Sequence, residues 1–160
     1  MNKILKSFGA IFIALIFISA IAMSVASSKI SKLEGEAVQF INSEIPQITK
    51  EWDSNILYEI ASPDLKAKAS SEDLSKLFKI LSSLGKLNKL NAPNGNIKIK
   101  FFGKNNSSNA SGYFECQSDF EKGPAVIKLT LEKYQDQWLV SSFHINSVTF
   151  LEIIKPPEKQ

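Results

Sequence analysis

SSEDLSKLFKILSSLGKLNKL, residues 70–90, decides the fold, because the spacing of its apolar residues changes within it. Ser70 and Asp73 have the spacing of a capping box, so we expect a helix over Ser71–Leu84. Gly85 stands where a left-handed C-terminal cap is needed. After Gly85 the apolar residues alternate with polar ones, which is the period of a strand. The predicted buried stripe of the helix is Leu74, Leu77, Phe78, Leu81 and Leu84.

Upstream of residue 70 the sequence predicts further helices. The first has its apolar face over 33–48, and Pro46 should kink it or end it near Ser43–Glu44. A second runs over Asn55–Ala61, with Asp53 or Ser54 as its cap. Ser62-Pro63-Asp64 is typical of a helix start, with a capping Ser and a Pro in the first position. The apolar face of the first helix comprises Leu33, Ala37, Phe40, Ile41, Ile45 and Ile48.

Downstream of Gly85 the sequence predicts strands. Asn94-Gly95 is a favoured two-residue hairpin turn, and Lys104–Ser111 is a polar connection between strands. We expect a turn or bulge at Gly123-Pro124 and a turn at Gln135-Asp136. The predicted strands are Leu87–Leu90, 97–101, Tyr113–Phe120, 127–131 and Trp138–Ser147.

Alternation predicts which side chains of two strands share a face. In the strand at 113–120 we expect one face to carry Phe114, Cys116 and Phe120, and the other to carry Tyr113, Glu115, Gln117 and Asp119. In the last strand we expect Leu139, Phe143 and Ile145 opposite Trp138, Val140, Ser142, His144 and Asn146. Helices followed by antiparallel strands predict an α+β domain, with N-terminal helices packed on a curved sheet of about four strands.

The N-terminal segment carries the clearest targeting pattern. Lys3 and Lys6 precede an uncharged stretch, residues 8–25, which is typical of an export signal. The small residues Ser24 and Ala26 fit cleavage after Ala26, which makes 1–26 a signal peptide. Eighteen uncharged residues are also just long enough to span a bilayer, so an uncleaved anchor stays open. Either way we expect export across the inner membrane, to a periplasmic, secreted or anchored location. The predicted division is 1–26 signal peptide or anchor, 27–150 domain and 151–160 polar tail.

Composition excludes several classes of function. The net charge is +3, but without Lys3 and Lys6 only 17 Lys remain against 16 acids. All basic residues are Lys, whereas nucleic-acid binders usually use Arg, so we expect no nucleic-acid partner. One Cys and one His exclude a disulfide framework and make a zinc site unexpected. We predict neither a metal nor a cofactor.

Several short motifs then suggest a family. The order of helices and strands, at this length, resembles the cone-shaped nuclear transport factor 2-like (cystatin-like) superfamily. Within it, the chain is similar to small exported bacterial domains of unassigned function. The resemblance covers roughly residues 33–148 and implies the cone-shaped fold and an exported location. Its motifs are Trp52-Asp53, Ala61-Ser62-Pro63-Asp64-Leu65, Leu84-Gly85-Lys86-Leu87, Phe120-Glu121-Lys122-Gly123-Pro124-Ala125, and Trp138 with Phe143-His144-Ile145-Asn146.

Two residues are candidates for catalysis. Enzymes of the cone-shaped fold place acids, Tyr or His inside the cavity, which points to His144, the only imidazole, and Asp119. The alternative is a structural or surface role for both. Cys116 is a candidate nucleophile or a buried small hydrophobe, and Asp53 is better explained as a helix cap. No copy of a known catalytic arrangement is recognisable, so whether the chain is an enzyme stays open, with a non-enzyme favoured.

Aromatic residues are the candidates for ligand binding: Trp52, Tyr58, Tyr113 and Trp138, which are alternatively core or rim residues. Lysines at 86, 89, 98, 100 and 104 form a cluster that fits either anionic headgroups or the protected edge of a sheet.

Three hypotheses follow. The first is a non-enzymatic exported module that binds a small apolar ligand or another envelope protein. The second is an assembly component tethered to the inner membrane, and the third is a cone-fold lyase or isomerase.

Overall fold

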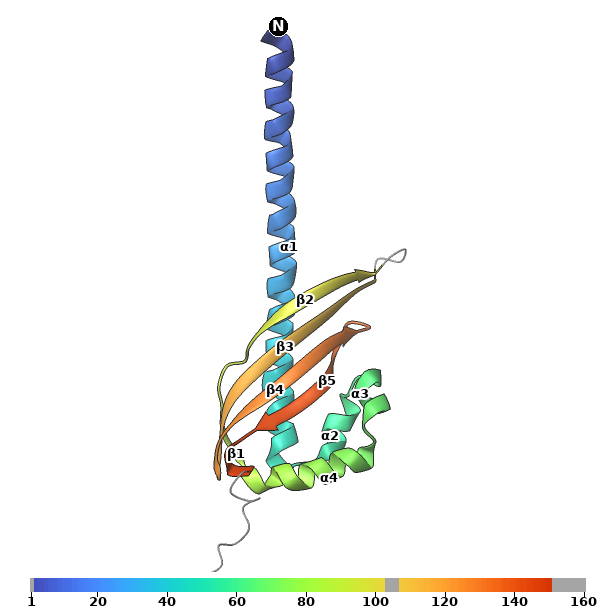
Figure 1. The fold of residues 1–160 in the computed structure, drawn as a ribbon, viewed down its shortest axis with the longest axis vertical. Helices are drawn as coiled ribbons and strands as arrows, with labels where there is room; N and C mark the ends of the chain where they lie inside the picture. Colours follow the sequence, from blue (N-terminus) through green and yellow to red (C-terminus); the bar gives the residue numbers. More distant parts are fainter. Residues whose placement is uncertain (1, 103–106, 151–160) are drawn as a thin grey trace, which may run out of the picture. The chain divides into compact units, whose positions relative to one another are not determined.

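The computed structural model describes the backbone of residues 2–102 and 107–150, and the side chains of residues 27–99 and 110–150 (Figure 1). The chain divides into two compact units, residues 1–33 and 34–160. The predicted signal or anchor, residues 1–26, lies outside the residues with described side chains, and the predicted tail from 151 lies outside the described residues. Among the residues with described side chains, no helix is long and apolar enough to cross a membrane.

Four α-helices precede the strands, as the sequence predicts. α1 runs over Asn2–Glu51, α2 over Ser54–Glu59, α3 over Pro63–Lys68 and α4 over Ser71–Leu81, followed by a 3-10 turn, η1, over Ser82–Leu84.

The predicted caps are confirmed. Asp53 accepts a hydrogen bond from the Asn55 N–H at 2.9 Å, and Ser62 caps α3. Ser70 and Asp73 form the predicted capping box of α4. Local sequence therefore determines where these three short helices begin.

Pro46 does not end α1, so of the two predicted outcomes, a kink or an end near Ser43–Glu44, the end is wrong. The helix continues to Glu51, with Pro46 on its exposed side. The ring removes one N–H, so the carbonyl of Asn42, also on the exposed side, is left to solvent. The opposite face is fully packed, with Ile41, Ile45 and Ile48 each at most 1% exposed. Packing of this face outweighs the cost of the proline.

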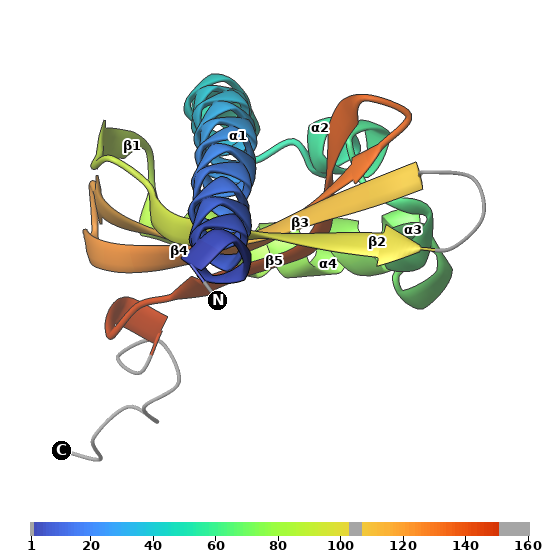
Figure 2. The same ribbon diagram turned by 90° about the horizontal axis from the view of Figure 1, so that it is seen from above.

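Within residues 2–102 and 107–150 the sheet has five antiparallel strands, where about four were expected, and it is curved and unclosed (Figures 1 and 2). The α+β class is confirmed. The strands are β1 Leu87–Leu90, β2 Asn94–Phe102, β3 Ser107–Phe120, β4 Gly123–Tyr134 and β5 Gln137–Asn146.

β1 and β2 do not form a hairpin, so the prediction of a turn at Asn94-Gly95 is wrong. Both strands pair with the same edge of β3: Leu90 lies opposite Ser118, and Asn94 lies opposite Glu115. Gly95 is needed for another reason. A Cβ at this position would lie 2.1 Å from the Tyr113 carbonyl oxygen, so its neighbours demand a residue without a side chain.

β3 begins earlier than predicted. Residues 107–111, expected within a loop, pair with β2 from Phe102 back to Lys98. Residues 104–106 of that predicted loop lie outside the described residues. The loop was predicted from polar composition alone, but a strand with a solvated face also accepts Ser and Asn. The turn at Gln135-Asp136 is confirmed, with both residues at positive φ, as a twisted two-residue hairpin requires.

A bulge in β5 changes which residues face the core. Thr130 pairs with Ser142 but Leu131 pairs with Val140, so Ser141 is an extra residue. Side chains alternate between the two faces on each side of the bulge, but the alternation is shifted by one residue across it. The prediction that Trp138, Val140 and His144 share one face is therefore wrong. Trp138 and Val140 are buried together with Phe143 and Ile145, whereas His144 is exposed.

The core lies between α1, α4 and the inner face of the sheet. A chain of aromatic rings links its parts: Trp52 stacks on Phe120 at 5.6 Å and meets Phe78 edge-on at 6.2 Å, and Phe78 lies 6.0 Å from Phe143. Leu77 is 38% exposed, because the face of α4 that packs is narrower than predicted, and Phe40 is only half-buried. The inner face of β3 and β4 is filled by Phe114, Cys116, Ile127, Leu129 and Leu131, each at most 1% exposed.

Candidate functional site

Three of the sequence motifs meet at one place, around Trp52. This residue follows α1 and has a φ of 53°, a conformation that is strained for a bulky side chain. Its indole N–H donates to the Gly85 carbonyl oxygen at 2.8 Å, and its ring stacks on Phe120. Trp52, predicted as a ligand-binding candidate, therefore joins the end of α1 to the start of β1 and to the end of β3.

Glu121 completes this junction. Its carboxylate accepts a hydrogen bond from the Lys86 N–H at 3.0 Å, and its own N–H donates to the Lys86 carbonyl oxygen. Gly85, which directly precedes Lys86, has a φ of 76°, and a Cβ at this position would lie 2.5 Å from the Glu121 carboxylate. The φ is positive, as the predicted cap requires, but a ψ of −158° is far from the left-handed helical region. These motif residues hold three segments together.

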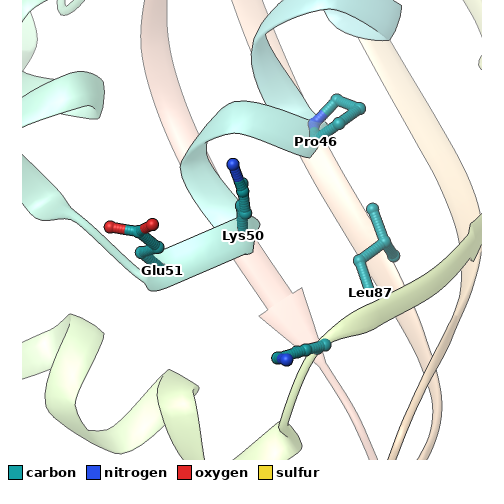
Figure 3. Close-up of a pocket in the computed structure, with 5 residues that line it drawn as sticks. Pro46, Lys50, Glu51 and Leu87 are labelled. Carbon is teal, nitrogen blue, oxygen red and sulfur yellow. The ribbon is translucent and has the colours of Figure 1, made fainter.

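A groove opens beside this junction, between the last turns of α1 and the start of β1 (Figure 3). Its volume is about 450 Å³, and it is lined by Pro46, Lys50, Glu51, Lys86 and Leu87. Of these five residues, only Lys86 was a candidate in the sequence analysis, as a member of the lysine cluster. Lys86 and Leu87 belong to the motif Leu84–Leu87, and Lys50 and Glu51 directly precede the motif Trp52-Asp53.

The catalytic candidates His144 and Asp119 are both exposed, on the outer face of the sheet. His144 lies opposite Lys128, which lies opposite Glu115, four residues before Asp119 on β3. Four residues of strand span about 13 Å, and the two intervening strand spacings add roughly 10 Å across the sheet. The two side chains therefore do not share one reacting atom.

The outer face carries a network of polar groups around Tyr113. Its hydroxyl donates to the Glu115 carboxylate at 2.5 Å, and Lys128 pairs with the same carboxylate at 2.9 Å. The Tyr113 hydrogen bond, followed by that from Lys128, lowers the pKa of Glu115. The Glu115 carboxylate in turn raises the pKa of Tyr113 and of Lys128. Tyr113, a ligand-binding candidate, is thus bound to its own sheet.

The other two aromatic candidates also have structural neighbours. Tyr58 is half-buried, and the Lys66 ammonium group lies 5.2 Å from its ring centre. Trp138 is 7% exposed, and within the described part of the chain its indole N–H has no hydrogen-bond partner. The Lys133 ammonium group lies 5.8 Å from the Trp138 ring and pairs with Glu36 of α1.

Cys116 is fully buried on the inner face of β3, and burial raises the pKa of its thiol to about 11. Burial and the raised pKa both disfavour the thiolate that a nucleophilic cysteine needs. The role of Asp53 as the cap of α2 agrees with its sequence interpretation.

The lysine cluster is divided by the register of the strands. Lys89 lies opposite Asp119, and Lys98 lies opposite Ser111, eight residues away on β3. Eight residues of strand span about 26 Å, so these lysines do not form one patch. The side chains of 100 and 104 lie outside the described ones.

Among the residues with described side chains, no group of three His, Cys, Asp or Glu lies close enough to hold a metal ion. No model of a known protein family matches the chain, and no curated protein matches it either.

Proposed function

We propose that the chain is an exported, non-enzymatic binding or interaction module of the bacterial envelope, with a domain of the nuclear transport factor 2-like type. The observation that carries the proposal is the filled inner face of β3 and β4. Five of the described side chains there are at most 1% exposed, so no chamber large enough for water, and still less for a substrate, borders them. Partners and ligands then meet the outer surface and its groove.

The separation of the polar candidates supports a non-catalytic role. A general base acts within hydrogen-bond reach of the proton that it removes, and a second catalytic group must reach the same substrate. Asp119 and His144 are on different strands of an exposed face, in different rows of the ladder. Glu115 is already engaged by Tyr113 and Lys128.

Export is inferred from residues 1–26 by their sequence alone. Two lysines, an uncharged stretch and the small residues Ser24 and Ala26 support translocation of the domain. The proposed location is the periplasm or the medium after cleavage.

One observation favours a second candidate, a tethered component of an envelope assembly. The backbone of α1 is helical without a break from Asn2 to Glu51, across the proposed cleavage site after Ala26. A helix has its peptide groups engaged internally, and this disfavours the extended backbone that proteases bind. An uncleaved segment would anchor the domain at the inner membrane.

Expression of the full chain in a bacterial host with two membranes tests both candidates. A mature mass lacking residues 1–26, recovered from the periplasm or medium, supports the free module. The full mass in the inner-membrane fraction supports the tethered component. A full-length chain recovered only from the cytoplasm contradicts export altogether.

The non-enzymatic part of the proposal has its own test. Deletion of the chromosomal copy should give a phenotype that His144→Ala and Asp119→Asn both rescue as well as the unchanged chain does. Failure of either variant, at normal protein levels, would contradict a non-catalytic role.

A further inference from the structure

The groove beside Trp52 has two kinds of lining. Pro46 and Leu87 provide apolar surface, and Figure 3 shows the Pro46 ring and the Leu87 side chain on the same side of the Lys50 stem. Lys50 and Lys86 are exposed, and within the described part of the chain neither ammonium group is in an ion pair. Their methylene stems extend the apolar lining, while their charged ends stay in water.

The one acidic group of the lining, Glu51, lies away from the apolar part. In Figure 3 its carboxylate is on the far side of Lys50 from Leu87. The lining itself carries two cations and one anion, and the Glu121 carboxylate, which is outside the lining, is engaged by the Lys86 N–H. The groove therefore has the charge pattern that complements a negatively charged group attached to an apolar body.

The walls of the groove are fixed before any ligand arrives. On one side, Trp52 directly follows the end of α1 at Glu51, and its indole N–H is bound to the Gly85 carbonyl oxygen. On the other, both the N–H and the carbonyl oxygen of Lys86 are bound to Glu121. Binding in such a groove loses little free energy to ordering of the protein.

We propose that this groove binds a single-chain anionic amphiphile of the fatty-acid class. The acyl chain lies against Pro46 and Leu87, and the carboxylate is held between the ammonium groups of Lys50 and Lys86. This inference rests on the proposed function as a binding module and names its ligand class. A neutral apolar molecule would leave both ammonium groups unused, and a cationic one would be repelled by them.

A fluorescence titration of the full chain with dodecanoate, below its critical micelle concentration, tests the proposal. The variant Trp138→Phe serves as the parent, so that Trp52, which directly follows the groove residue Glu51, is the only tryptophan. We expect a saturable change in Trp52 emission. Adding Lys50→Gln and Lys86→Gln should weaken dodecanoate binding by about tenfold or more, because two charge-assisted hydrogen bonds are lost.

Two controls separate the groove from other apolar surface. Lys76→Gln with Lys79→Gln removes two exposed charges from α4 and should leave the affinity for dodecanoate unchanged. Dodecanol has the same chain without the charge, and it should bind the parent and the Lys50/Lys86 variant equally. Circular dichroism confirms that each variant is folded.

Absence of a saturable change in Trp52 emission would overturn the inference. Equal affinity of dodecanoate for the parent and the Lys50/Lys86 variant would do so too, because binding would then not depend on the groove. Neither result bears on the proposed function itself, which is judged from the mature mass and from rescue by His144→Ala and Asp119→Asn.

Discussion

Trp52 donates its indole N–H to the carbonyl oxygen of Gly85, 33 residues away, at 2.8 Å. The bond joins two residues that both have positive φ, 53° and 76°. The conformation of Trp52 has a cost in isolation and is maintained by its contacts, the stacked Phe120 ring among them, whereas glycine adopts a positive φ readily. This junction fixes the end of α1 relative to the first strand, and with it the wall of the groove.

Replacing the two tryptophans separately should measure how much the hydrogen bond from Trp52 to Gly85 contributes to the free energy of unfolding. Trp52→Phe keeps an aromatic ring but removes the donor to Gly85, so we expect a loss of about 1 kcal/mol beyond the effect of the smaller ring. Trp138→Phe is the matched control, since its indole N–H has no partner within the described part of the chain. Urea unfolding measures both. Equal losses of stability would show that the hydrogen bond contributes nothing.

Two glycine substitutions should change the free energy of unfolding in opposite directions. Gly85→Ala should destabilise the domain by about 2 kcal/mol or more, because its backbone conformation suits only glycine and a Cβ meets Glu121. Gly35→Ala should stabilise it by about 0.5–1 kcal/mol, since Gly35 is within α1 and its Cβ meets no atom within 4 Å. Thermal unfolding of the two variants checks this. A Gly85→Ala variant as stable as the parent would contradict the described junction.

The sequence predicted local features well wherever local chemistry determines them. The caps at Asp53, Ser62 and Ser70 and the change of period after Gly85 depend on neighbouring residues only, and all are confirmed. The alternation of β3 from Tyr113 to Phe120 is confirmed for the same reason.

The errors arose where distant contacts override a local preference. Pro46 stays within a helix because the opposite face of α1 is buried. Asn94-Gly95 stays within a strand because β3 is long enough to pair with β1 and β2 in succession. A bulge at Ser141 has no sequence signal of its own, so alternation could not predict that Trp138 shares the buried face with Phe143 and Ile145. The groove was missed for a similar reason, since its residues come from segments 35 or more positions apart.

The rate at which the Cys116 thiol reacts tests whether this residue is buried on the inner face of the sheet. With a pKa of about 11, only about one thiol in a thousand is ionised at pH 8. The fully buried sulfur is also inaccessible to reagents. We expect the native chain to react with a thiol-specific disulfide reagent only as fast as it opens, and the urea-unfolded chain to react at once. Labelling of the native chain at the rate of free cysteine would contradict the packing of the inner face.

The network around Glu115 predicts a dependence of stability on pH. Hydrogen bonds from Tyr113 and then Lys128 lower the pKa of Glu115 in the folded chain below its ordinary value of 4.5. The folded state therefore favours the ionised carboxylate, and this contribution to stability is present above the unfolded pKa. It is lost as the pH falls through the lower folded pKa. Stability of the parent relative to Glu115→Gln should decrease over that range.

The same network allows a direct measurement. Tyr113→Phe removes the largest cause of the shift while it leaves Lys128 in place. In a carbon-13 NMR titration of the Glu115 carboxyl, we expect its pKa to rise in this variant toward the ordinary value. The difference between parent and Glu115→Gln should shrink accordingly, because less of the ionised form is favoured by folding. An unchanged titration of Glu115 would show that the Tyr113 hydroxyl does not donate to this carboxylate in solution.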